Sequence, residues 1–164
     1  MSPSSEAHQD AVIRLAAPDD RTAIEALTEE AYRPYTQLFD APPIPVTEDY
    51  RPHIAADGVW LLESGGELAG VIVLETEADH MMIFSVAVSP RFQGRGFGVR
   101  LLRWAENRAR AAHLPEVRLY TNARMEKNIA LYGAFGFTET GRRPNPVRPG
   151  WTLVDMAKRV DARP

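Results

Sequence analysis

The stretch VAVSPRFQGRGFG, residues 86–98, joins two segments of different character and decides how the chain folds. The apolar run that leads into it predicts a strand from His80 to Val88. Beyond it, small and apolar residues recur at helical spacing and predict a helix from Gly98 to His113. Between the two lies a turn with three glycines and no acidic residue. Such a turn binds anions, because the first backbone N–H groups of a helix lack partners and the helix dipole is positive there.

Two common phosphate-binding loops do not match this turn. A P-loop requires a Lys-Ser or Lys-Thr pair after its last glycine, but Val99 and Arg100 follow Gly98. A dinucleotide-binding turn requires a third glycine where this chain has Val99. Both mismatches argue against a nucleotide-binding α/β domain. A tight turn that needs glycine for its geometry alone is the other alternative.

The pattern that does match is Gln93-x-x-Gly96-x-Gly98, directly after Val-Ala-Val-Ser-Pro. It resembles the pyrophosphate-binding signature of the GNAT superfamily, the acyl-CoA-dependent N-acetyltransferases. The resemblance implies that acetyl-CoA is the co-substrate, that its pantetheine pairs with the strand edge, and that a backbone N–H near Val86 stabilises the oxyanion. The donor-binding residues that it implies are Val86, Ala87, Val88, Gln93, Gly94, Arg95, Gly96, Phe97, Gly98 and Val99.

A second pattern, over residues 122–137, reads N-x-x-x-x-x-N-x-x-L-Y-x-x-x-G-F and resembles a segment of the same superfamily. On a helix, Asn128 and Tyr132 are four residues apart and share one face. Leu131 and Phe135 form a neighbouring stripe that we expect to pack on the sheet. The resemblance implies that Asn128 binds the pantetheine and that Tyr132 protonates the leaving thiolate. A helix-surface amide and a core tyrosine are the respective alternatives.

The candidates for the general base near the start of the donor-side strand are Glu75, Glu77, Asp79 and His80, and of these we select His80 and Glu75. Histidine is the side chain whose ordinary pKa lies nearest to neutrality, so it can accept a proton directly or through water. A turn histidine and a solvated carboxylate, both without a catalytic role, are the alternatives. A further alternative is that ordered water removes the proton and that no residue serves as a dedicated base.

Aromatic residues gather between the first and second predicted strands, in a region that shapes the acceptor pocket of the GNAT superfamily. The resemblance implies substrate-binding roles for Tyr32, Tyr35, Tyr50 and His53, and for Tyr120 farther along the chain. Aromatic rings can hold a cationic amine by cation–π contact. Composition alone indicates only an aromatic surface loop.

Composition sets the remaining bounds. Residues 1–9 carry Ser, Pro and His and predict a flexible tail, and the length of 164 residues predicts a single domain, residues 10–164. The net charge of −3 gives no reason to propose nucleic acid as a partner, and no apolar run is long enough to cross a membrane. The chain has no cysteine, which favours a cytoplasmic location and excludes a cysteine-ligated metal, and we predict no metal cofactor.

The predicted elements follow the order β-α-α-β-β-β-α-β-α-β-β. This is the order of the GNAT fold, an α+β (mixed α/β) class whose mostly antiparallel central sheet has about seven strands, splayed between the fourth and fifth, with about four helices. Before the donor-side strand we predict a strand over Ala11 to Ala16, a helix capped by Asp19 or Asp20 and fading by Arg33-Pro34, and irregular chain from Tyr35 to Pro45. A helix over Glu48 to Ala56, capped by Thr47, and a hairpin of Val59 to Glu63 with Leu68 to Glu75 follow. After the central helix we predict a strand over Val117 to Thr121, a helix over Met125 to Phe135, a strand over Phe137 to Gly141, a loop over Arg142 to Gly150, and a last strand over Trp151 to Arg159.

The function predicted from these observations is acetyl transfer from acetyl-CoA to a primary amine of a small molecule, by direct attack in a ternary complex. A catalytically idle acyl-CoA-binding sensor or scaffold, acetylation of a protein amine, and use of a longer acyl-CoA are the alternatives. A homodimer is possible, with the last strand as the candidate edge for pairing.

Overall fold

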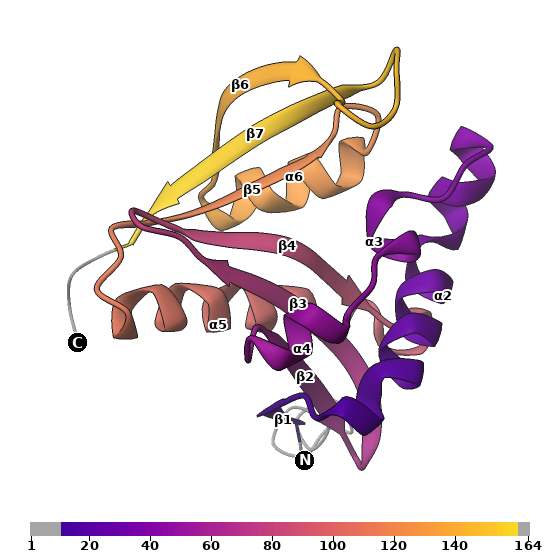
Figure 1. Ribbon diagram of the computed structural model, residues 1–164, viewed down its shortest axis with the longest axis vertical. Coiled ribbons are helices and arrows are strands. Elements are labelled where there is room, and N and C mark those ends of the chain that lie inside the picture. The colour runs from indigo at the N-terminus through magenta and orange to yellow at the C-terminus, as the bar shows by residue number, and fades with distance from the viewer. Residues whose placement is uncertain (1–10, 161–164) are drawn as a thin grey trace. The chain divides into compact units, whose positions relative to one another are not determined.

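The computed structural model describes residues 11–160, and the predicted tail, residues 1–9, lies outside them (Figure 1). The strands are β1 (Ala11–Leu15), β2 (Val59–Ser64), β3 (Glu67–Thr76), β4 (Met81–Val88), β5 (Glu116–Asn122), β6 (Thr138–Pro144) and β7 (Thr152–Arg159). The helices are α2 (Arg21–Phe39), α3 (Ile44–Thr47), α4 (Arg51–Ala55), α5 (Phe97–Ala111) and α6 (Glu126–Phe135), with short 3-10 turns η1 (Pro18–Asp20) and η2 (Pro90–Phe92). The predicted order of strands and helices is confirmed, with one more short helix than expected in this part of the chain.

The strands form one mixed sheet in the order β1-β2-β3-β4-β5-β7-β6. The pairs β1–β2, β2–β3, β5–β7 and β6–β7 are antiparallel. The β4–β5 pair is parallel and covers only three positions, Met81 to Ile83 against Val117 to Leu119. This confirms the predicted α+β class and the opening of the sheet between its fourth and fifth strands.

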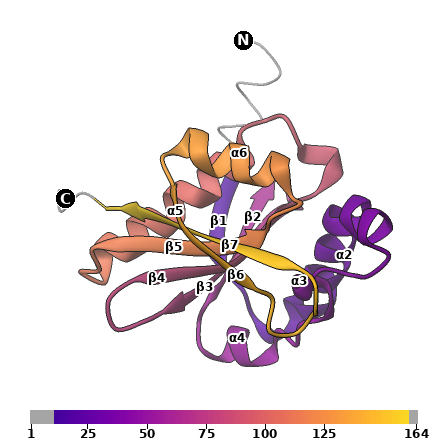
Figure 2. The ribbon, with the colours of Figure 1, turned by 90° about the horizontal axis from the view of Figure 1, so that it is seen from above.

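The last strand is not an edge strand, and the prediction that it offers an edge for dimerisation is wrong. β7 lies between β5 and β6 and is hydrogen-bonded on both sides (Figure 2). The reason is that β6 and β7 form a hairpin whose first strand takes the outer position. The edge of this side of the sheet is therefore β6.

The described chain contains two compact units. One comprises residues 11–75 and 85–103, and the other comprises residues 76–84 and 104–160. Both β4 and α5 run from one unit into the other, so the division does not follow a linker. The single domain over residues 10–164 stays a prediction.

The core of the first unit forms around β3. Six consecutive residues, from Ala69 to Leu74, are buried, which shows that both faces of this strand are covered. Ile24 of α2, Leu62 of β2 and Leu101 of α5 are fully buried in the same unit. No helix within residues 11–160 has the length and apolar character needed to span a bilayer.

The first helix does not end before Pro34, contrary to the prediction. α2 is one helix that contains Pro34 and continues to Phe39 (Figure 1). An internal proline costs a helix about 3 kcal/mol, whereas burial of one large apolar side chain returns about 1.5–3 kcal/mol. Tyr32 and Phe39 are both buried, and Tyr35 stacks on Phe39 with their ring centroids 5.9 Å apart. Aromatic packing on both sides of the proline thus offsets its cost.

The helix predicted over Glu48 to Ala56 is shorter and is not capped by Thr47. Thr47 is the last residue of α3, and its hydroxyl donates to the Ile44 carbonyl (3.3 Å). Glu48 has an extended backbone, and α4 begins only at Arg51. The sequence Ile-Pro-Val-Thr forms a helical turn of its own, because proline is favoured in the first turn of a helix.

Two other boundaries differ from the predictions. Asp20 stands at the start of α2 but makes no side-chain cap bond, because its carboxylate binds the Arg14 guanidinium (2.9 Å) and the Ala17 N–H (2.7 Å). β6 extends past Gly141 to Pro144, into the predicted loop, because its residues pair with β7 along this whole length.

Candidate functional site

The glycine turn has the backbone geometry of an anion site. Gly94 and Gly96 have φ values of 80° and 79°, in the left-handed region that glycine reaches without strain. α5 begins at Phe97, and the Arg100 N–H already donates to the Gly96 carbonyl (3.1 Å). The N–H groups that precede it have no acceptor within the helix. The turn can therefore present backbone donors to the oxygens of a phosphate.

Several contacts within the first unit hold this turn in place. The Ser89 N–H donates to the Ala69 carbonyl of β3 (2.8 Å), and the Gln93 amide donates to the Val88 carbonyl (3.3 Å). The rings of Phe92 and Phe97 are buried with their centroids 6.2 Å apart. The predicted donor residues from Val88 to Phe97 are thus brought together.

The end of β4 meets one of the aromatic residues predicted to bind the acceptor. Ser85 and Ala87 are buried, whereas Val86 and Val88 are half-buried on the opposite face. The Tyr32 hydroxyl donates to the Val86 carbonyl (3.2 Å). Since the N–H and C=O of one strand residue point to the same side, the Val86 N–H faces the side from which Tyr32 approaches.

Tyr35 extends this aromatic group along α2. Its ring lies 6.4 Å from that of Tyr32 and stacks on Phe39. Burial raises the pKa of the Tyr35 hydroxyl, so this phenol stays protonated at neutral pH. The three rings form a row on one side of the helix.

Of the other two predicted acceptor residues of this region, Tyr50 is buried, and His53 is held by the Glu48 carboxylate. Tyr50 is only 1% exposed, and its hydroxyl donates to the Pro45 carbonyl (2.5 Å). Burial raises the pKa of Tyr50 to about 12. His53 Nε2 lies 2.8 Å from Glu48 Oε2. Tyr50 therefore presents almost no surface to a ligand.

In the second unit, α6 carries the predicted proton donor. Tyr132 is 6% exposed, and its ring meets that of Phe137 edge to face at 6.1 Å. Asn128 lies on the same helix and contacts Met125 with its amide nitrogen 3.8 Å from the sulfur. The prediction that Leu131 packs on the sheet is wrong, because Leu131 is 41% exposed and Tyr132 takes the buried face.

The two candidate bases differ in how they are held. Glu75 is half-buried near the end of β3. His80 precedes β4, and its Nδ1 lies 2.7 Å from Asp79 Oδ1. This hydrogen bond lowers the pKa of Asp79, and Arg118 also ion-pairs with that carboxylate (3.5 Å). The Asp79 carboxylate therefore fixes the orientation of the His80 ring.

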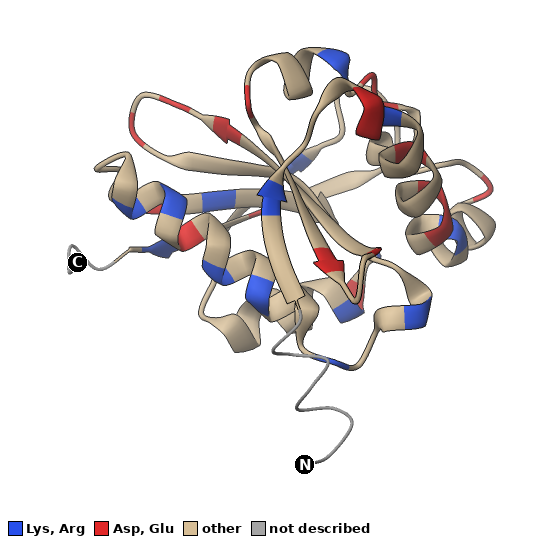
Figure 3. Cartoon of the chain, turned by 90° about the horizontal axis from the view of Figure 1, so that it is seen from below, with Lys and Arg blue, Asp and Glu red and all other residues tan. Residues whose placement is uncertain are grey.

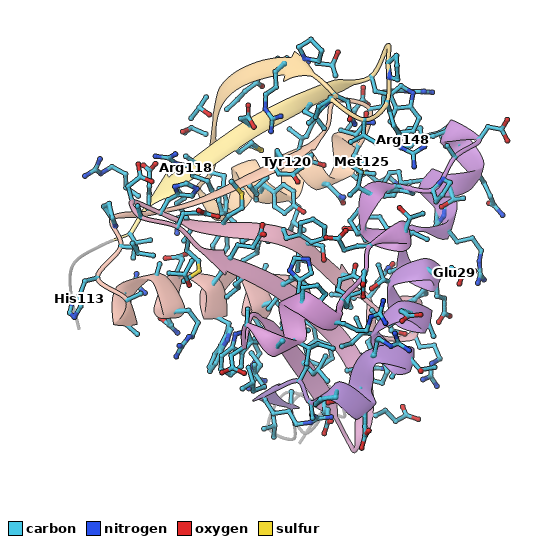
Figure 4. All side chains as sticks on the ribbon, in the orientation of Figure 1. Glu29, His113, Arg118, Tyr120, Met125 and Arg148 are labelled. Carbon is cyan, nitrogen blue, oxygen red and sulfur yellow. The ribbon has the colours of Figure 1, made fainter. Side chains whose placement is uncertain are left out.

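Tyr120 lies on β5 on the same face as Arg118, two residues away (Figure 4). The Arg143 guanidinium stands over its ring at 5.1 Å and forms a fork with Asp155, with N–O distances of 2.9–3.2 Å. Sequence reasoning missed Arg143 and Asp155, since they come from β6 and β7 and no short motif links them. No group of three or more His, Asp or Glu residues within 11–160 is placed to hold a metal ion.

Comparisons with known proteins agree with this arrangement. A family model described as the Acetyltransferase (GNAT) family matches residues 24–137. N-acetyltransferase 8 of Mus musculus is 28% identical over 102 residues, 58% of this chain and 44% of the relative. The L-2,4-diaminobutyric acid acetyltransferase of Vibrio parahaemolyticus is 33% identical over 109 residues, 62% of this chain and 58% of the relative. The chain thus spans about half the length of these curated relatives.

A solved structure shows the same fold at low sequence identity. The PaiA N-acetyltransferase of Thermoplasma acidophilum, in complex with coenzyme A, superposes with a TM-score of 0.77 at 17% identity. The match covers 91% of this chain and 98% of that one.

Proposed function

The chain belongs to the Acetyltransferase (GNAT) family, and on that premise we propose that it transfers an acetyl group from acetyl-CoA to a primary amine of a small molecule. The observation that supports this most strongly is the pre-formed glycine turn at the start of α5, which lies within the matched residues. The amine attacks the thioester directly while both substrates are bound. Direct attack requires an anchored donor, a neutral amine, a stabilised oxyanion and a protonated leaving group.

Donor binding is the role of the turn and of β4. The backbone N–H groups from Gln93 to Val99 bind the diphosphate of acetyl-CoA, with the dipole of α5 favouring its negative charge. The pantetheine pairs with Val86 to Val88 as an added strand. Asn128 binds the pantetheine from α6. The Val86 N–H then donates to the oxyanion of the tetrahedral intermediate.

Two side chains move protons in this proposal. Tyr132 protonates the thiolate as it leaves, and a phenol suits this step because its ordinary pKa is about 10, so it carries a proton at pH 7. His80, oriented by Asp79, accepts the proton of the attacking amine directly or through water. Glu75 is the second candidate for this base.

The acceptor binds beside aromatic side chains. Tyr32 and Tyr35 form one wall, and Tyr32 is bonded to the strand that carries the oxyanion donor. Tyr120 and His53 are further contacts. A small amine fits this setting, because its cationic form is attracted to ring faces before it loses a proton. The similarity to a diaminobutyric acid acetyltransferase supports the same class of acceptor.

The test is release of free thiol from acetyl-CoA by a panel of diamines, amino acids and aryl amines, with wild type beside Tyr132→Phe. We expect at least one amine to be acetylated by wild type, and Tyr132→Phe to lower kcat by about 100-fold with little change in the KM for acetyl-CoA. Binding of acetyl-CoA without turnover of any amine would favour the sensor or scaffold instead. An unchanged kcat in Tyr132→Phe would remove this tyrosine from the acid role.

A further inference from the structure

The buried face of α2 brings a tyrosine to the backbone of β4. Ile24, Thr28 and Tyr32 follow one another at intervals of four, so they lie on one side of the helix, and all three are buried. Charged residues of α2, such as Arg33, are exposed away from this face (Figure 3). The packing of the helix therefore fixes the ring of Tyr32, whose hydroxyl donates to the Val86 carbonyl (3.2 Å).

The Val86 carbonyl lies on the edge of β4 that faces away from β3. The Ser89 N–H donates to the Ala69 carbonyl of β3 (2.8 Å), so the polar backbone atoms of Ser89 point to that strand. The Ala87 carbonyl points the same way, because its oxygen would lie 3.2 Å from a Cβ added at Gly70 of β3. Alternate residues of a strand direct their N–H and C=O groups to opposite sides, so those of Val86 point to the other edge.

Strand pairing does not reach Val86 on that edge. In the described chain, β5 pairs with β4 only from Met81 to Ile83. A strand without a hydrogen-bonded neighbour is free to twist or to bulge, and either change moves its N–H groups. The Tyr32 hydroxyl supplies the donor that a neighbouring strand would otherwise supply. It therefore holds the backbone of Val86 beyond the point where the pairing of β4 with β5 ends.

We infer that Tyr32 is a positioning residue for the oxyanion donor: its hydroxyl fixes the Val86 backbone, so that the Val86 N–H is aimed at the carbonyl oxygen of the bound thioester. The inference rests on the proposed function, since it takes the Val86 N–H as the oxyanion donor. Because the N–H and C=O of an extended residue point to the same side, a hydrogen bond to one of them restricts the other. This role belongs to the hydroxyl of Tyr32 and is separate from contact of its ring with the acceptor.

The experiment measures the stretching frequency of the thioester carbonyl in bound acetyl-CoA, labelled with carbon-13 at that atom, and needs no acceptor amine. A hydrogen bond to the carbonyl oxygen polarises the C=O bond and lowers its infrared frequency. We expect the band of the wild-type complex to lie below that of free acetyl-CoA. In Tyr32→Phe the band should return at least about half-way to the free value, because the Val86 N–H is no longer aimed at the oxygen.

Calorimetry and kinetics separate this role from donor binding. The dissociation constant of Tyr32→Phe for acetyl-CoA should stay within about threefold of the wild-type value, because the hydroxyl does not contact the donor. With an amine that wild type acetylates, kcat should fall about tenfold without a change in the KM for acetyl-CoA.

Thr28→Val is the matched control, because it removes a hydroxyl from the same buried face one turn earlier, where that hydroxyl donates to the Ile24 carbonyl (2.8 Å). The carbonyl band of its complex should coincide with that of wild type. If Thr28→Val moves the band as far as Tyr32→Phe does, a general loosening of α2 explains both changes and the inference is overturned.

Three further results overturn the inference while the acetyltransferase proposal stands. The first is the same carbonyl band in wild type and Tyr32→Phe. The second is a gain in donor affinity in Tyr32→Phe, because the hydroxyl then competes with the donor for the Val86 carbonyl. The third is loss of donor binding in Tyr32→Phe, because the hydroxyl then serves the fold or the donor site. Failure of wild type to bind acetyl-CoA would instead refute the donor site, and with it both proposals.

Discussion

At the scale of single residues, the site depends on backbone positions as much as on side chains. Gly94 and Gly96 supply left-handed φ angles, and Val86 supplies a carbonyl to Tyr32. The motif from Gln93 to Gly98 could be predicted from the sequence, because its glycines stand at every second position within six residues and this spacing is diagnostic. The contact between Tyr32 and Val86 could not, because 54 residues separate them and no local pattern encodes the approach.

The charge requirement of the turn can be tested at Gly96. Gly96→Glu should weaken acetyl-CoA binding at least about 100-fold, because it places a carboxylate where the diphosphate is expected to bind. Calorimetric titration with acetyl-CoA measures the change. Gly96→Ala is the control, since it imposes the strain of a positive φ, about 1 kcal/mol, without the charge. Similar affinities in the two variants would mean that strain alone explains the loss and that no anion binds there.

At the scale of elements, the strands and the helices α5 and α6 were predictable from periodicity and capping glycine. Gly136 ends α6 in a left-handed conformation as expected. The course of α2 was not predictable, because local rules place a helix end at Arg33-Pro34 and only tertiary burial of Tyr32 and Phe39 overrides them. Aromatic residues were recognised as a group, but their helical arrangement was not.

The cost of the internal proline gives a prediction for α2. Pro34→Ala restores a helical N–H and should raise the free energy of unfolding by about 1 kcal/mol, less than the full proline penalty because the unfolded chain gains freedom. Urea denaturation followed by circular dichroism measures it. Pro52→Ala is the control, since Pro52 lies in the first turn of α4, where proline is favoured, and should not stabilise. If Pro34→Ala is no more stable than wild type, the helix is already relaxed around its proline.

At the scale of the whole molecule, the α+β class and the order of elements followed from the sequence. The pairing of the last two strands did not, because either strand of a hairpin can take the inner position and long-range contacts decide between them. The burial of Tyr50 could not be predicted from the sequence either, because its neighbours in sequence are polar residues and prolines.

Stability at high pH should reflect that burial. The pKa of Tyr50 is raised to about 12, whereas that of an unfolded tyrosine is about 10. As pH rises through this interval, the unfolded chain loses its proton first, so the free energy of unfolding falls, by about 2–3 kcal/mol in total. Below about pH 9 this contribution is fully present.

Urea denaturation at several pH values between about 9 and about 12 measures this fall. Tyr50→Phe should be less stable near pH 7, because it has lost the hydrogen bond to Pro45. Its free energy of unfolding should change less with pH across the alkaline interval than that of wild type. Tyr120→Phe, at a half-exposed position, should keep the wild-type slope. If the free energy of unfolding falls equally with pH in wild type and in Tyr50→Phe, Tyr50 is not the cause of the fall.

The interior position of β7 has a consequence for synthesis on the ribosome. β7 follows both β5 and β6 in chain order, yet it supplies the hydrogen-bonding partner of both. While residues 152–159 are still within the exit tunnel, the nascent chain exposes two unsatisfied strand edges that could bind other chains. This part of the sheet therefore closes only after residues 152–159 have left the exit tunnel, and a ribosome that stalls before this point should favour aggregation.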